Sequence, residues 1–404
     1  MESRPSKVPA KTAGQATSPV PILSNPQTAP STRLMSLDAL RGFDMFWIIG
    51  GESLLQAIAN LSGSPTFRTL AYRHTEHPEW NGFTFYDLIF PTFMFIAGVA
   101  VPFSFASHWS RGESSAQLHF RIIRRGVVLV LLGLVINGIL NFDFTLHFAE
   151  DTSGHRQLVH DFSDVRFPSV LGRIGLAYMF AALIALHTRP RNQLLTAIGL
   201  LLGYWAALKF IPVPGFETGS LFPGETLGDF IDRHVLPGRL YKIVRDPEGL
   251  FSTIPAIATV LFGVIAGHWL RRIDRGGAVK AGGLAIAGGV FLALAYAWNT
   301  VFPINKNLWT SSFVLWTSGC SLLLLSVFYL VVDVWKIRGW AFFFVVIGAN
   351  AITVYVGQHI IDFNALAKIV FSGHMHSVLR ESGGLFLKWL FLFFLYRQRI
   401  FLRV

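Results

Sequence analysis

The chain has 404 residues, of which 52% are hydrophobic and only 14% are charged, and its mean hydropathy is +0.49. A soluble domain is about 25% charged, so this composition excludes an ordinary soluble enzyme and indicates an integral membrane protein. The net charge of +11 does not indicate a nucleic-acid partner, because positive charge on membrane proteins collects in cytoplasmic loops.

Residues 1–33 are rich in Pro, Ser, Thr and Ala and contain no apolar core. A signal peptide would need an apolar stretch of about 7–15 residues, so this composition is typical of a disordered tail. We expect a disordered cytoplasmic tail over 1–33 and a single membrane domain over 34–404. The one cysteine, Cys320, lies in an apolar run and excludes a disulfide framework within the chain.

Apolar segments of roughly 20 residues follow the tail, and they do not alternate as the strands of a barrel would. They lie at 43–61, 83–106, 122–141, 168–187, 193–211, 250–270, 280–301, 310–332, 340–361 and 384–396. The expected fold is therefore all-α, a polytopic membrane bundle of about ten transmembrane helices.

Lysine and arginine set the expected orientation of these spans. With the N-terminus inside, more than half of these residues fall in the inner segments, which are short. The long loops at 62–82, 142–167, 212–249 and 362–383 then lie outside. Both termini are expected on the cytoplasmic side, which requires an even number of spans.

Charged residues interrupt the apolar runs, and each costs about 2.5–3.5 kcal/mol at the centre of a membrane helix. Asp87 lies near the outer start of the second span, and Arg173 opens the fourth. These two residues either form a buried ion pair that holds the bundle together or have a functional role. Glu52 follows Gly50 and Gly51 near the outer mouth, where it is either catalytic or part of a structural ion pair. Asp44, near the inner end of the first span, is expected at the interface.

Polar and aromatic residues mark two outer segments. His74, His77 and Trp80 precede the second span, although a histidine in a surface loop is by itself common. The turn "FPINKNLWTSS" places Asn and Trp together, which suits the hydroxyls and the apolar face of a sugar, but equally suits a capped helix start with an interfacial anchor. The irregular spacing of His147, His155 and His160 does not favour a metal site, and none is predicted.

Several segments together resemble heparan-alpha-glucosaminide N-acetyltransferase and its bacterial relatives. They are "SLDALRGFDMFWIIGG" (36–51), "HPEWNGFTFYDLIFPTFMFIAGV" (77–99), "VLGRIGLAY" (170–178), "IPVPGFETG" (211–219), "DPEGLFSTI" (246–254), "FPINKNLWTSSFV" (302–314) and "NAITVYVGQHI" (350–360). The resemblance runs in register from Arg33 to Val404. It implies a ten-span core that transfers acetyl from cytosolic acetyl-CoA to the amine of an amino sugar on the outer face, and it suggests a homodimer.

The active histidine of that family lies three residues before a "WNG" triplet, which corresponds to His77 here. The animal enzyme has an asparagine where this chain has Glu52. This departure argues against direct use of the animal acceptor and provides an acid that would orient His77 or recognise a cationic amine.

We therefore expect His77 to act as general base or acyl carrier, oriented by Glu52 or Asp87, because an ammonium cannot attack a thioester until a base takes its proton. Asn81 and Asn307 are candidate donors to the thioester oxyanion. The expected substrate-binding residues are Trp80, Asn81, Asn305, Lys306, Asn307 and Trp309. The candidates for binding the CoA phosphates are Arg41, Arg124, Arg125 and Arg403, each of which would serve equally as a cytoplasmic anchor of its helix.

A bacterial inner (cytoplasmic) membrane location follows from this reading, with the site mouth on the periplasmic side and an envelope amino sugar as acceptor. The alternative from another class is a transporter or flippase of a sugar-containing envelope precursor, because intramembrane carboxylates and glycine-broken helices suit that function too. It predicts inverted repeats, which the sequence does not display. A scaffold gives no reason for Glu52 and His77 to share the outer mouth.

Overall fold

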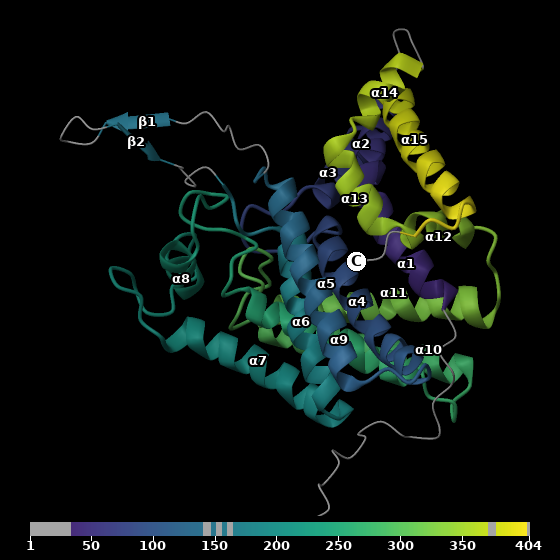
Figure 1. Cartoon of the computed structure of the whole chain (residues 1–404), viewed down its shortest axis with the longest axis horizontal. Coiled ribbons are helices and arrows are strands. Elements are labelled where there is room, and N and C mark those ends of the chain that lie inside the picture. Colours follow the sequence, from purple (N-terminus) through teal and green to yellow (C-terminus); the bar gives the residue numbers. More distant parts are fainter. Residues whose placement is uncertain (1–33, 140–146, 151–155, 160–164, 371–376, 402–404) are drawn as a thin grey trace, which may run out of the picture.

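A computed structural model of the chain describes residues 34–139, 147–150, 156–159, 165–370 and 377–401. The predicted tail over 1–33 and the candidate Arg403 lie outside the described residues. The described part is helical apart from a short antiparallel hairpin of β1 (His147–Glu150) and β2 (Arg156–Val159), which extends away from the helices (Figure 1). The predicted all-helical class is confirmed for the body of the molecule.

Most of the long helices begin and end close to the edges of the predicted apolar runs. In chain order the helices are α1 (Met35–Phe46), the π-helical segment η1 (Trp47–Gly51), α2 (Glu52–Leu61), α3 (Pro65–Thr75), α4 (Tyr86–Trp109), α5 (Ser115–Ile136), α6 (Val170–His187), α7 (Pro190–Phe210), α8 (Leu227–Val235), α9 (Thr253–Leu270), α10 (Gly277–Trp298), α11 (Ser311–Phe328), the π-helical segment η3 (Tyr329–Val334), α12 (Ala341–Ala349), α13 (Ala351–Ile360), α14 (Phe363–Val370) and α15 (Ser377–Arg397). In contrast to the long helices, α1 begins eight residues before the first run, and three shorter helices, α3, α8 and α14, lie in segments predicted as outer loops.

Six helices of the described part are long and apolar enough to cross a membrane, namely α4, α6, α7, α9, α10 and α11 continued by η3. The pair α12 and α13 gives a seventh candidate, bent by 68° at its break. Their length and apolar composition mark the chain as a membrane protein. The number of ten spans and the cytoplasmic side of both termini stay predictions.

The first predicted span, 43–61, is not one straight helix. The chain passes from α1 through η1 into α2, and Gly50 inside η1 adopts a φ of 144°, a backbone conformation that glycine tolerates because it has no Cβ. The carbonyl oxygen of Ile49 accepts a hydrogen bond from Nζ of Lys388 on α15 at 2.6 Å. A buried lysine therefore satisfies a carbonyl at this break, which separates α1 from α2.

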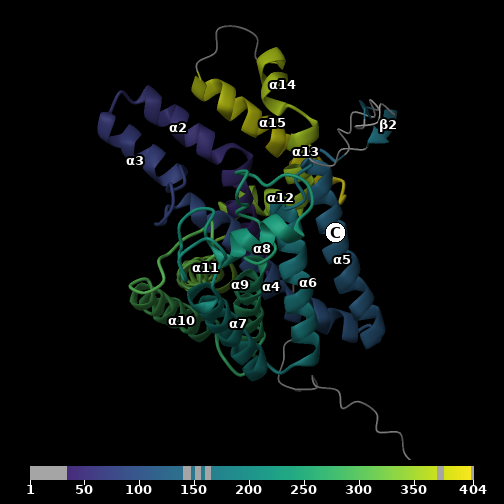
Figure 2. The same ribbon diagram turned by 90° about the vertical axis from the view of Figure 1, so that its left-hand side faces the viewer.

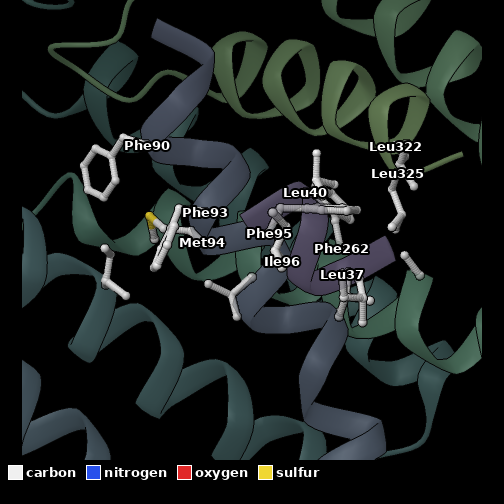
Figure 3. Close-up of a cluster of buried hydrophobic side chains, with 14 of the residues drawn as sticks. Leu37, Leu40, Phe90, Phe93, Met94, Phe95, Ile96, Phe262, Leu322 and Leu325 are labelled. Atoms are coloured by element: carbon white, nitrogen blue, oxygen red, sulfur yellow. The ribbon is translucent and has the colours of Figure 1, made fainter. Parts of the chain in front are cut away.

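The core forms around α4, most of which is buried. α4 and α9 approach closely because Gly98 and Gly263 face the partner backbone; a Cβ on Gly98 would lie 2.1 Å from the carbonyl oxygen of Val260. Leu40 of α1 lies beside Phe95 of α4 in the same buried cluster (Figure 3). α2, α3, α14 and α15 gather toward one end of the molecule, and α7 and α10 lie toward the other (Figures 1 and 2).

Candidate active site

The start of α4 fixes the orientation of Asp87. The backbone N–H and the hydroxyl of Thr84 both donate to Oδ2 of Asp87, at 3.0 and 3.2 Å, and the backbone N–H of Asp87 donates to the carbonyl of Thr84 at 3.1 Å. This Thr-x-x-Asp spacing gives one half of a capping box, because the acid accepts from the backbone of Thr84 while the Thr84 hydroxyl donates to the acid. Oδ2 is therefore engaged by the helix start, and Oδ1 is left for another partner.

That partner is His77, whose Nδ1 lies 2.6 Å from Oδ1 of Asp87. The Asp87 side chain is fully buried, whereas the His77 side chain is 48% exposed. A proton on Nδ1 would make this close approach to a carboxylate favourable, and it would leave the acceptor lone pair of the neutral ring on Nε2. An accessible imidazole on a buried acid is the arrangement that a general base requires.

Lys306 reaches the same pair from the loop between α10 and α11. Its Nζ lies 3.0 Å from Nε2 and 3.3 Å from Nδ1 of His77, and 3.3 Å from Oδ1 of Asp87. Burial lowers the pKa of Lys306, while the charge of Asp87 acts in the opposite direction. The contact joins segments 229 residues apart in the chain.

The buried Asn305 holds this loop in place. Its Nδ2 donates to Oδ1 of Asn81 at 3.0 Å, and its Oδ1 accepts from the backbone N–H of Leu308 at 2.9 Å. The backbone N–H of Gly82 donates to the carbonyl of Ile304 at 2.9 Å and adds a second link between the two loops. The predicted substrate residues Asn81, Asn305 and Lys306 therefore lie together beside His77, and Asn305 acts there as a connector.

Glu52 reaches the site through Tyr86. The Glu52 carboxyl group interacts with the hydroxyl of Tyr86, whose ring centroid lies 5.4 Å from that of His77. Oε1 of Glu52 also lies 3.4 Å from Nε2 of Gln56, which donates to the hydroxyl of Thr75 on α3 at 2.8 Å. Of the two acids predicted to orient His77, Asp87 is the one in direct contact with it.

The two predicted tryptophans differ in access. The Trp80 indole N–H donates to the carbonyl of Leu221 at 2.9 Å, and the guanidinium of Arg245 lies 4.5 Å from its ring centroid. Trp309 is 1% exposed, and its ring centroid lies 5.0 Å from that of Phe90. In this conformation a sugar outside the protein cannot contact the Trp309 ring. Asn307, between Lys306 and Leu308, is half-buried.

Arg173 does not form the ion pair with Asp87 that was one reading of the sequence. Its Nη2 donates to the carbonyl of Gly249 at 3.1 Å and to the hydroxyl of Ser252, and its guanidinium lies 4.9 Å from the Trp309 ring centroid. Asp87 contacts His77 and Lys306 instead, because the helix start turns its carboxylate outward. Within the described residues, Nε and Nη1 of this buried arginine have no hydrogen-bond partner.

A second ion-pair group, centred on Arg166, holds the loop that follows α8. Nε and Nη2 of Arg166 donate to the two carboxylate oxygens of Asp246 at 2.7 and 2.6 Å, and Nη2 also contacts Glu248. These carboxylates raise the pKa of Arg166 above its ordinary value although burial opposes them. The same loop carries Arg245, which stacks on Trp80, so this group shapes the surroundings of the site.

The arginines predicted to bind CoA make separate contacts. Nη1 of Arg41 lies 3.3 Å from Oδ1 of Asp38 in its own helix, and the guanidinium of Arg125 lies 4.4 Å from the Tyr178 ring centroid on α6. Arg124 is exposed on α5. Asp44, expected at an interface, is instead fully buried, with both carboxylate oxygens lacking a hydrogen-bond partner among the described residues.

Sequence reasoning missed three participants, namely Thr84, Tyr86 and the Arg166 ion-pair group. The capping-box spacing from Thr84 to Asp87 was the available signal for the first, because it predicts an acid that faces the helix start. In the described part of the chain, no three or more His, Cys, Asp or Glu side chains lie close enough together to hold a metal ion. Of the histidines in the outer loop, His155 and His160 lie outside that part.

Comparison with known proteins gives two kinds of similarity. Residues 33–142 match a family model described as a domain of unknown function, DUF5009. The chain is 31% identical over 387 residues to heparan-alpha-glucosaminide N-acetyltransferase of Mus musculus, covering 82% of this chain and 55% of that protein. It is 29% identical over 428 residues to the Homo sapiens protein of the same name, covering 92% and 60%. The chain thus spans little more than half the length of the curated relatives it matches.

Proposed function

This chain is a relative of heparan-alpha-glucosaminide N-acetyltransferase, and from that kinship we propose that it is a transmembrane N-acyltransferase. It moves an acetyl group from cytosolic acetyl-CoA to the amine of an amino sugar on the outer face of a bacterial inner membrane. The observation that carries the proposal is the accessible imidazole of His77 on the buried carboxylate of Asp87 at the start of α4.

His77 is the proton acceptor in this proposal. Acetyl-CoA supplies an activated acyl group as a thioester when bound. An amino sugar arrives largely as its ammonium, which must lose a proton to Nε2 of His77 before it can attack. Asp87 fixes the ring and offsets the positive charge that His77 then gains. Transfer through an acetylated His77 uses the same residues and stays open beside direct attack.

Other residues of the mouth bind and position the acceptor. Asn81 and Asn307 are the proposed donors to the oxyanion, and Trp80 offers a ring at the rim of the site. Glu52 acts on Tyr86 rather than on His77, so its proposed role is to set the position of that ring. Arg41, Arg124, Arg125 and Arg403 stay the candidates for the CoA phosphates; their positive charge suits phosphate chemistry, but the described contacts of Arg41 and Arg125 are with Asp38 and Tyr178.

The test is release of free CoA by the purified full chain given acetyl-CoA and a panel of amino sugars. We expect thiol release that depends on the sugar and that falls by about 10²-fold or more in His77→Gln, because the general base is lost. His74→Gln is the matched control, since His74 is an exposed histidine on α3.

A transporter or flippase is the second candidate, and one observation favours it. Two stretches are interrupted, at Gly50 between α1 and α2 and at Asn350 between α12 and α13, and interrupted membrane helices are common at transporter binding sites. Absence of thiol release with every amino sugar, together with sugar uptake into vesicles, would support this function and reject the acyltransferase.

A further inference from the structure

The amine of Lys306 occupies the place where the mechanism needs the amine of the acceptor. Its Nζ lies 3.0 Å from Nε2 of His77 and 3.3 Å from Oδ1 of Asp87. An acceptor ammonium that gives its proton to Nε2 must approach within hydrogen-bonding distance of that atom. The lysine ammonium therefore stands in for the ammonium group of an amino sugar.

We propose that Lys306 is itself an acetylation site, modified by the enzyme's own machinery when no acceptor is bound. The inference rests on the proposed acetyl-CoA-dependent function. It differs from that function because the product is an acetylated protein rather than an acetylated sugar.

The geometry gives Lys306 what a reactive amine requires. The base that would deprotonate an acceptor, His77, is already in contact with Nζ. The Lys306 side chain is 20% exposed, so it is partly accessible to solvent. Burial also lowers the pKa of Lys306, which increases the fraction of neutral amine. The hydrogen bonds of Asn305 hold the loop, so the amine stays close to His77 in the absence of substrate.

The step balances without any further reactant. The ammonium gives one proton to His77, and the neutral nitrogen attacks the thioester carbonyl carbon. The C–N bond forms, the C–S bond breaks, and the nitrogen loses its second proton. One of the two protons goes to the leaving CoA thiolate and the other goes to solvent, so the products are acetyl-lysine and free CoA. The amide carries no charge, so it no longer forms the ion pair with Asp87, and it cannot return the acetyl group.

The experiment incubates the purified full chain with acetyl-CoA that carries an isotopically labelled acetyl group, without an amino sugar. Mass spectrometry then measures the label at each lysine with time. We expect Lys306 to gain label about 10²-fold faster than Lys242 and Lys368, which are exposed and form no ion pair or histidine contact within the described part of the chain. An amide withstands hydroxylamine, whereas an acetyl-histidine does not, so the treatment separates Lys306 labelling from a relay through His77.

Two variants keep the test falsifiable. In His77→Gln, and independently in Asp87→Asn, the preference for Lys306 over Lys242 should disappear while the slow background labelling of Lys242 is unchanged. Lys306 labelling at the rate of Lys242, in a preparation that releases CoA with an amino sugar, overturns the inference and leaves the proposed function standing. Equal labelling of Lys306 in wild type and His77→Gln also overturns it, because the reaction is then ordinary solution chemistry. Absence of both sugar-dependent CoA release and Lys306 labelling rejects the two together.

Discussion

Nδ1 of His77 and Oδ1 of Asp87 lie 2.6 Å apart, with the acid fully buried and the imidazole half-exposed. The other oxygen of Asp87 accepts hydrogen bonds from Thr84, so the carboxylate has little freedom to turn away. The ring orientation of His77 is thus set by the first turn of α4, and Nε2 is the nitrogen that contacts Nζ of Lys306.

Replacing Asp87 by Asn should lower kcat/KM for acetyl transfer by about 10²–10⁴-fold, the usual contribution of general acid–base catalysis. The amide keeps the shape of the side chain but not its charge, so neither the protonated His77 nor Lys306 has its anion. The measurement is sugar-dependent CoA release. Glu79→Gln, at an exposed acid of the same loop, is the control and should retain wild-type activity. Equal activity of Asp87→Asn and wild type would remove Asp87 from the mechanism.

Glu52→Gln should have a much smaller effect, about five- to tenfold on kcat/KM, because it changes the interaction of one neutral neighbour, Tyr86, and breaks no contact with His77. Tyr86→Phe removes the other end of the same interaction and should reproduce this loss. The double variant should then be no worse than either single variant. A loss as large as that of Asp87→Asn would show that Glu52 acts directly on the reacting groups.

The sequence was sufficient to predict the membrane-helical class and that His77 comes shortly before the apolar run with Asp87, because both follow from local patterns; the outer side of His77 stays a prediction. Long apolar runs give helices, and His77 precedes the run that contains Asp87 by a few residues. The sequence left open which acid orients His77. The position of Glu52 follows the break at Gly50, and glycine pairs occur in straight membrane helices as well as in broken ones.

The contact of Lys306 with His77 could not be predicted from the sequence, for a different reason. It spans 229 residues and depends on how two loops meet, which no periodicity encodes. The same holds for Arg166 and its two carboxylates. For Trp309 the sequence left a sugar contact and a structural anchor equally open, and its backbone φ of 52° and its packing on Phe90 place the ring in the core.

Gly42→Ala should destabilise the folded protein by about 1–3 kcal/mol, the usual cost of overpacking. Gly42 lies where α1 crosses α12, and an added Cβ would lie 1.7 Å from the carbonyl oxygen of Phe344. Backbone must move to admit the methyl group, and a flexible side chain cannot relieve the clash. Thermal unfolding in detergent measures the effect. Gly199→Ala on α7 is the control, because an added Cβ there meets nothing within 4 Å; an equal drop in both variants would contradict the packing argument.

Asp232 on α8 gives the stability of the outer loop a predictable dependence on pH. Burial raises the pKa of Asp232 from 3.8 to about 6, although the backbone N–H groups of Phe251 and Leu250 and the charge of Arg173 act against the rise. Between these two pH values the folded state holds a proton that the unfolded chain has released. The contribution of Asp232 to stability is therefore greatest below pH 4, falls as the pH rises through about 6, and stays low above it.

Asp232→Asn should remove this dependence, because Asn keeps Oδ1 as the acceptor for Leu250 and never ionises. Relative to wild type, the variant should gain stability as the pH rises through about 6, by on the order of 3 kcal/mol at pH 8, since the folded and unfolded pKa values differ by about two units and one unit corresponds to about 1.4 kcal/mol. Apparent Tm values of the two proteins in detergent between pH 4 and 8 measure the difference. Asp274→Asn, at an acid near the end of α9 whose pKa is lowered by the neighbouring Arg272, should lack this gain. A wild-type Tm that runs parallel to that of Asp232→Asn over the whole range would show that Asp232 titrates alike in the folded and unfolded states.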